Sequence, residues 1–139
     1  MPRKGPILII EDDYDDQELL QEVFDELNIP NEIKFFSSCL SVLDYLLTAL
    51  IKPFLIISDI NIPIMSGLEL KQKINETEEL LRKHIPFIFL STNPDTLVIT
   101  QAFQLNVQGY FVKPSTLTDI KLMMRTILDY WSLNALPSS

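Results

Sequence analysis

Polar side chains of the kinds that bind cations and phosphate stand at the ends of four short apolar runs in this 139-residue sequence: Glu11 and Asp12, Asp59, Ser91, and Lys113. Three carboxylates brought close together repel one another and raise each other's pKa, so such a cluster normally holds a cation. Oxygen ligands without His or Cys indicate Mg²⁺, which also favours phosphate oxygens. A carboxylate nucleophile with Mg²⁺, a lysine and a hydroxyl has the groups that in-line phosphoryl transfer requires.

The four runs that carry these residues are apolar throughout: Ile7–Ile10, Phe54–Ile57, Phe87–Leu90 and Tyr110–Val112. Short runs of this kind are typical of strands buried on both faces, as in a parallel sheet covered by helices. A fifth strand is expected at Ile33–Phe36. Because the carboxyl ends of parallel strands meet at one edge of the sheet, the polar side chains should converge there.

Helices are predicted between the strands from apolar positions that recur with a period of 3.6 residues. The first two would bury Leu19, Leu20, Val23, Phe24 and Leu27, and then Leu43, Leu46, Leu47 and Leu50. A third would begin near Gly67, a fourth would have Pro94 at its first position and run through Leu97 to Leu105, and a fifth would begin near Thr116. The sequence thus predicts a doubly wound α/β domain of the flavodoxin-like (βα)5 kind, with five parallel strands and five helices.

Length and composition limit the classes of protein that this chain can belong to. We expect one domain over residues 1–139, with a core at about 6–131 and a C-terminal tail at 132–139. A single cysteine, Cys39, excludes an internal disulfide framework. The net charge of −8 argues against binding to nucleic acid, and no stretch resembles a signal peptide or a membrane span. A cytoplasmic protein that binds neither nucleic acid nor membranes is expected.

Four segments together carry a resemblance to a known family: residues 7–13, residues 58–67, the hydroxyl of Ser91, and residues 109–114. Their order and spacing, from about Pro6 to Trp131, resemble the receiver domain of two-component response regulators. The resemblance implies that Asp59 is the phosphoacceptor and that Mg²⁺ is bound by Asp12, Asp59 and the backbone carbonyl of Asn61, with Glu11 acting through water. It also implies that Ser91 is the switch hydroxyl, that Tyr110 changes rotamer with it, and that Lys113 binds phosphate and precedes a cis bond to Pro114.

The sequence departs from the family's pattern at three positions. Thr92 stands where a small residue is common and could narrow access to the phosphoryl group. Ile64 replaces a frequent glycine and places an apolar side chain beside the site, and Ser91 replaces the commoner threonine. By the same resemblance, Asn61 and Asn93 flank the water that attacks the acyl phosphate.

Other residues are better explained by structure than by chemistry. Asp13, Asp15 and Asp16 stand where a helix begins, which favours capping over metal binding. His84 is expected in an exposed loop, and Trp131 is expected to anchor the core or an interface.

The resemblance implies a stand-alone receiver in phosphorelay signalling. It would take a phosphoryl group from a histidine kinase or a histidine phosphotransfer protein and would catalyse only its own modification. Its output surface, formed by the fourth helix, the fifth strand and the fifth helix, would bind a downstream protein or a second copy of the chain. The alternatives are a receiver-like interaction module that is never phosphorylated and a haloacid-dehalogenase-like phosphatase. The phosphatase requires a second Asp at the position of Asn61, and a nucleotide-binding Rossmann enzyme requires a glycine-rich turn that is missing here.

Overall fold

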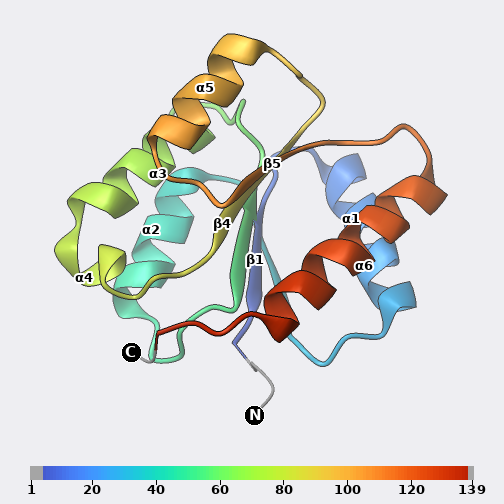
Figure 1. Cartoon of the computed structure of the whole chain (residues 1–139), viewed down its shortest axis with the longest axis horizontal. Coiled ribbons are helices and arrows are strands. Elements are labelled where there is room, and N and C mark those ends of the chain that lie inside the picture. The colour runs from blue at the N-terminus through green and yellow to red at the C-terminus, as the bar shows by residue number, and fades with distance from the viewer. Residues whose placement is uncertain (1–4, 138–139) are drawn as a thin grey trace.

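Five strands form one parallel sheet in the order β2-β1-β3-β4-β5 in the computed structural model, which describes residues 5–137 (Figure 1). Their bounds are β1 Ile7–Ile10, β2 Ile33–Phe36, β3 Leu55–Ser58, β4 Phe87–Ser91 and β5 Gly109–Val112. All four neighbouring pairs are parallel, so the strands all end at the same edge of the sheet. The predicted fold class is confirmed, and this edge is where the candidate residues meet.

Helices cover both faces of the sheet (Figure 1). Their bounds are α1 Tyr14–Leu27, α2 Cys39–Thr48, α3 Gly67–Glu76, α4 Glu78–Leu81, α5 Thr96–Gln104 and α6 Leu117–Leu133. Helices α1 and α6 lie on one face, and α2, α3 and α5 lie on the other. None of these helices, in the part of the chain that the structure describes, has the length and apolar content needed to cross a membrane.

The alternation of side chains along β1 explains why its sequence is apolar throughout. Ile7 and Ile9 pack into the core on the side of α1 and α6, whereas Leu8 and Ile10 pack into the core on the opposite side. All four are at most 1% exposed. Each such burial stabilises the fold by about 1.5–3 kcal/mol, so a polar residue within the strand would be costly and the polar groups are confined to the strand ends.

Helix α2 presents a different face to the core from the one predicted. Cys39, Val42 and Leu46 are its buried residues, whereas Leu47 is 48% exposed and Leu50 is fully exposed. The prediction holds for Leu46 and for the partly buried Leu43, which pack into the core. It was wrong for Leu47 and Leu50, because the helix ends at Thr48, so Leu50 lies beyond it, and Leu47 lies about 100° around the helix from Leu46.

The number of helices and the start of α5 also differ from the prediction. The four-residue α4 gives a sixth helix, whose single turn is too short to produce a periodic pattern in the sequence. Helix α5 begins at Thr96 because the Asp95 carboxylate accepts a hydrogen bond from the Leu97 amide at 2.9 Å and caps the helix. Pro94 therefore lies in the preceding loop and not at the first helical position.

The segment after α6 contacts the body of the domain. Leu136 packs against the core cluster on the side of α1 and α6. The chain that follows α6 runs beneath the sheet toward α2 and α4 (Figure 1). Within the expected tail of residues 132–139, Leu136 is half-buried and forms part of the packing; residues 138 and 139 lie outside the described range.

Candidate functional site

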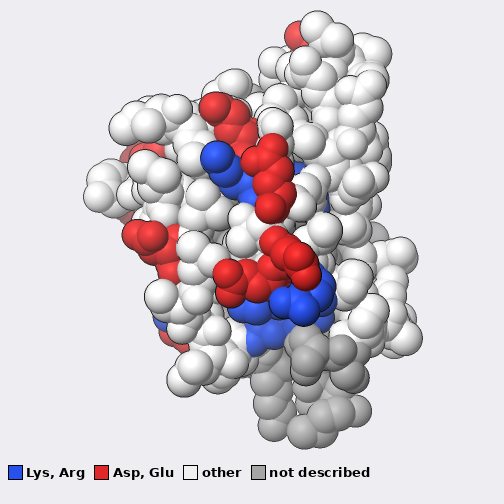
Figure 2. Space-filling view, turned by 90° about the vertical axis from the view of Figure 1, so that its left-hand side faces the viewer, with Lys and Arg blue, Asp and Glu red and all other residues white. Residues whose placement is uncertain are grey.

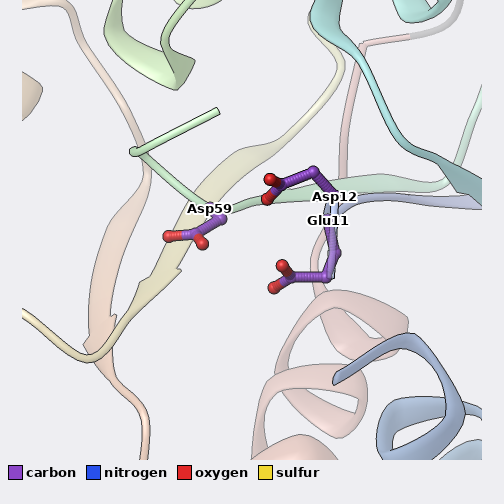
Figure 3. Close-up of side chains that lie close together, drawn as sticks. All are labelled: Glu11, Asp12 and Asp59. Carbon is purple, nitrogen blue, oxygen red and sulfur yellow. The ribbon is translucent and has the colours of Figure 1, made fainter. Parts of the chain in front are cut away.

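Three carboxylates meet where β1 and β3 end. Glu11, Asp12 and Asp59 each place one oxygen within 4.8 Å of those of the other two (Figure 3). Register accounts for this meeting, because Ile10 of β1 pairs with Ser58 of β3 and each strand is followed at once by its acidic residues. The structure thus brings the sequence-predicted acidic residues together.

The environment of the cluster favours protonation of two of its members. Burial raises the pKa of Glu11 to about 7, and the negative charges of Asp59 and Asp16 contribute to the increase. Burial also raises the pKa of Asp59, and the charge of Asp12 acts in the same direction. A cation bound here would oppose both effects because it favours the charged carboxylates.

Asp59 is held by the backbone that follows it. Its Oδ1 accepts a hydrogen bond from the Ile60 amide at 2.7 Å, and its own amide donates to the Ile10 carbonyl at 3.0 Å. Gly67 permits the close approach of α3, because a Cβ at that position would lie 2.3 Å from the Asp59 carbonyl oxygen and 2.7 Å from the Phe89 ring. Gly67 is therefore required because a side chain at this position would clash with the backbone of Asp59 and the ring of Phe89.

Lys113 extends from the end of β5 into the same region, and its side chain is 11% exposed. Its Nζ lies 3.2 Å from Oδ1 of Asp16, in the first turn of α1. The lysine is also close enough to Glu11 and Asp59 to favour their charged forms. Asp16 was predicted only as a helix-start residue, whereas the structure makes it the ion-pair partner of Lys113. The capping role itself belongs to Asp13, whose carboxylate accepts from the amides of Asp15 and Asp16.

Ser91, Asn93 and Tyr110 are linked by hydrogen bonds. The Asn93 amide donates to Ser91 Oγ at 3.2 Å, and the Tyr110 hydroxyl donates to the Asn93 carbonyl at 2.5 Å. Ser91 is buried and Tyr110 is half-buried beside Phe89, with 6.2 Å between ring centroids. The two residues predicted to switch together therefore contact the same peptide segment.

The remaining predicted residues lie around this edge of the sheet. Asn61, Thr92 and Ile64 are exposed, and a backbone interaction with Asn61 lowers the pKa of Asp59. Ile64 is 92% exposed and has a φ of 74°, which is a strained conformation for a β-branched residue. The described residues contain no cis peptide bond, so the expected cis bond before Pro114 is wrong; the trans form of such a bond is favoured by about 0.5–1 kcal/mol.

Cys39 and His84 both lie apart from the acidic cluster, and the exposed position expected for His84 is confirmed. Cys39 is buried, and burial raises the pKa of its thiol to about 11, so it is not a reactive thiolate at neutral pH. His84 is exposed and lies far along the chain from the acidic cluster, in the loop before β4.

Comparison with known proteins decides the family. Residues 7–125 match the response regulator receiver domain family. The chain belongs to this family. It is thus a receiver domain of two-component signalling, in which receivers are the partners of histidine kinases.

The alignments with individual relatives cover most of this receiver and most of each relative. The response regulator Rcp1 of Synechocystis sp. is 28% identical over 130 residues, which are 90% of this chain and 87% of Rcp1. The phosphorylated cyanobacterial phytochrome response regulator RcpA matches in structure with a TM-score of 0.86 at 28% identity, covering 97% of this chain and 99% of RcpA. The Mn²⁺-bound form of Rcp1 matches with a TM-score of 0.83 at 28% identity, covering 96% of this chain and 99% of the other.

Proposed function

We propose that this receiver accepts a phosphoryl group on Asp59 from a phosphohistidine of a histidine kinase or phosphotransfer protein. A carboxylate oxygen of Asp59 attacks the phosphorus, a P–O bond forms, and the P–N bond to the imidazole breaks, with its electron pair leaving on the nitrogen. The observation that carries the proposal is the convergence of Glu11, Asp12 and Lys113 on Asp59 at the sheet edge of a receiver domain. The phosphorylated state of RcpA, a relative of similar length, supports it.

The donor set at this edge fits Mg²⁺. Asp12 and Asp59 would bind the ion directly, the backbone carbonyl of Asn61 would complete the protein ligands, and the buried Glu11 would act through a water molecule. Close carboxylate oxygens without nitrogen or sulfur ligands are the donors that Mg²⁺ prefers. When bound, Mg²⁺ would offset the negative charge of the carboxylates and of the phosphoryl oxygens. The Mn²⁺ in a structure of Rcp1 supports a divalent cation.

Mass spectrometry of the protein after incubation with acetyl phosphate and Mg²⁺ tests the acceptor. One phosphoryl group should be added, and Asp59→Asn should abolish the addition. Asp44→Asn is the matched control, because Asp44 is an exposed aspartate on α2, away from the cluster. Modification that persists in Asp59→Asn, or that lies on His84 or a serine, would contradict the assignment.

Phosphorylation is proposed to change the surface formed by α5, β5 and α6. The Ser91 Oγ now accepts from the Asn93 amide, so its own hydrogen is available to donate to a phosphoryl oxygen. That hydrogen bond would draw the loop after β4 inward. The movement would take the Asn93 carbonyl away from the Tyr110 hydroxyl and allow the Tyr110 ring to turn toward the core. Thr92 borders the same loop and would limit access to the phosphoryl group, while Pro114 fixes the chain after Lys113.

Amide chemical shifts on addition of beryllofluoride and Mg²⁺ test this switch. Shifts should extend over residues 97–110, and Tyr110→Phe should alter their pattern because the phenylalanine lacks the hydroxyl that binds Asn93. Shifts confined to α1 would contradict the mechanism. The surface would serve a downstream protein or a second copy of the chain.

The two alternative functions differ in measurable ways. A receiver-like interaction module would bind its partner equally well as wild type and as Asp59→Asn, and it would show no covalent modification. A haloacid-dehalogenase-like phosphatase would turn over phosphate esters, which requires an acid at the position of Asn61 that an amide cannot supply.

A further inference from the structure

A cavity of about 340 Å³ lies at the opposite edge of the sheet from Asp59. Its wall is formed by α3, α4, the loops that precede β4 and β5, Trp131 of α6, and residues 136–137 after that helix. Most of the wall is apolar, with Ile74, Leu80, Ile85, Trp131 and Leu136 among its residues. The volume is at the lower end of the range of about 300–1,000 Å³ typical of small-molecule sites.

Among the described residues that line the cavity, Lys71 is the one lysine or arginine, and none is Asp or Glu. The lysine is 6% exposed, although lysine is seldom buried without a carboxylate partner. Within the described residues no carboxylate oxygen lies within 4.0 Å of its Nζ. A cationic side chain is thus buried in an apolar wall without an anionic partner.

The Lys71 ammonium is nevertheless held in a defined position. Its Nζ donates to Oδ1 of Asn75 at 2.9 Å and lies 5.8 Å from the centroid of the Phe87 ring. Asn75 is itself fixed, because its Nδ2 donates to the Leu105 carbonyl at 2.9 Å. A lysine ammonium has three N–H donors and Asn75 occupies one, so donors remain for a ligand.

We propose that this cavity binds a small organic monoanion, a carboxylate on an apolar body, with Lys71 as its charge partner. The Lys71 ammonium matches one negative charge on the ligand, and the apolar side chains accommodate the rest of it. Burial lowers the pKa of Lys71, which is the cost that a bound anion would offset. The residues that line the cavity are separate from the acidic cluster around Asp59.

The charge preference of this site arises inside the cavity and not from the surface. On the face that carries α2, α3 and α4, acidic and basic side chains lie next to one another in a central band (Figure 2). A mixed surface attracts anions and cations to a similar extent, so it would not by itself select a carboxylate.

Trp131 provides a local probe, because it lines the cavity and is the sole tryptophan in the sequence. Titration of the full chain with octanoate below its micelle concentration should change the Trp131 fluorescence to saturation. Octanamide has the same shape without the charge. Its affinity should be lower than that of octanoate by a factor of about ten or more, which corresponds to about 1.4 kcal/mol of binding free energy or more. Equal affinities, or no saturable change with either compound, would overturn the proposal.

Two variants locate the charge partner. Lys71→Met retains the length of the side chain, and it should bind octanoate and octanamide with affinities within about twofold of each other. Lys73→Met removes an exposed lysine from the same helix and should retain the wild-type preference. If Lys71→Met kept the preference for octanoate, or if Lys73→Met lost it, Lys71 would not be the partner. The wild-type comparison of acid and amide tests the site even if Lys71→Met folds poorly.

Discussion

Lys113 forms an ion pair with Asp16, with 3.2 Å between Nζ and Oδ1, at the same sheet edge as the three carboxylates. The lysine that is proposed to bind the phosphoryl group is therefore already bound to a carboxylate on α1. Phosphoryl oxygens at Asp59 would have to compete with Asp16 for this lysine. This competition links the first helix to the chemistry at the end of β3.

Asp16→Asn should increase phosphorylation by acetyl phosphate, because it removes the competing charge. The Asp16 side chain in this pair is 41% exposed, and partly exposed ion pairs are worth about 0.2–1 kcal/mol, so the rate should rise roughly 1.4- to fivefold. Phosphorylation time courses by mass spectrometry would measure the change. Asp15→Asn alters the net charge equally in the same helical turn and should have little effect. A slower Asp16→Asn would show instead that Asp16 positions Lys113 productively.

Metal-free protein should lose stability as the pH rises through the pKa of Glu11. This pKa is raised from 4.5 to about 7, so the folded state holds a proton that the unfolded state has released between these values. The contribution of this proton to the free energy of unfolding is fully present below pH 4.5 and is lost once the pH exceeds about 7. At about 1.4 kcal/mol per pKa unit, the loss is on the order of 3 kcal/mol.

Urea unfolding in EDTA at pH 5 and pH 8 would measure this loss. Glu11→Gln should reduce the difference between the two pH values, whereas Glu22→Gln, on the exposed face of α1, should retain it. An unchanged difference in Glu11→Gln would assign the pH dependence to other groups.

Mg²⁺ should stabilise the folded protein, because the three carboxylates are together in the folded chain and far apart in the unfolded one. Stabilisation grows with concentration and reaches about 2.7 kcal/mol at one hundred times the dissociation constant. Asp12→Asn and Asp59→Asn should each stabilise the metal-free protein by on the order of 1 kcal/mol and weaken the effect of Mg²⁺. Thermal melts with EDTA and with Mg²⁺ at neutral pH test both effects. A lower melting temperature for Asp59→Asn in EDTA, with no Mg²⁺ shift in either protein, would make the carboxylates purely structural.

Ile64→Gly should stabilise the protein. Ile64 has a φ of 74°, and this region costs an L-residue with a side chain roughly 1–2 kcal/mol. The greater freedom of glycine in the unfolded chain offsets about 0.5–1 kcal/mol, which leaves a gain of up to roughly 1.5 kcal/mol. Denaturant unfolding would measure it. Ile51→Gly is the control, because Ile51 is an exposed isoleucine whose φ is outside the left-handed region, and this change should lower the stability. A similar loss of stability in Ile64→Gly would mean that the Ile64 side chain stabilises its loop.

The sequence by itself determined the strands, their parallel arrangement and the convergence of Glu11, Asp12 and Asp59. A strand buried on both faces must be apolar throughout, so its end is marked by the first polar residue. The Thr116 cap of α6 and the start of α3 at Gly67 were also predictable, because capping depends on neighbouring residues.

The tertiary structure alone decided which groups lie against one another across elements. The pairing of Lys113 with Asp16 depends on how the start of α1 is placed relative to the end of β5. The buried position of Lys71 depends on the packing of α3 and α4 with the chain after α6. Leu50 is exposed because α2 ends before it. Ile64 has a positive φ because its loop is closed by a hydrogen bond, at 2.8 Å, from the Gly67 amide to the Ile60 carbonyl. Local patterns report the periodicity of one element, whereas these features depend on distances between residues far apart in the sequence.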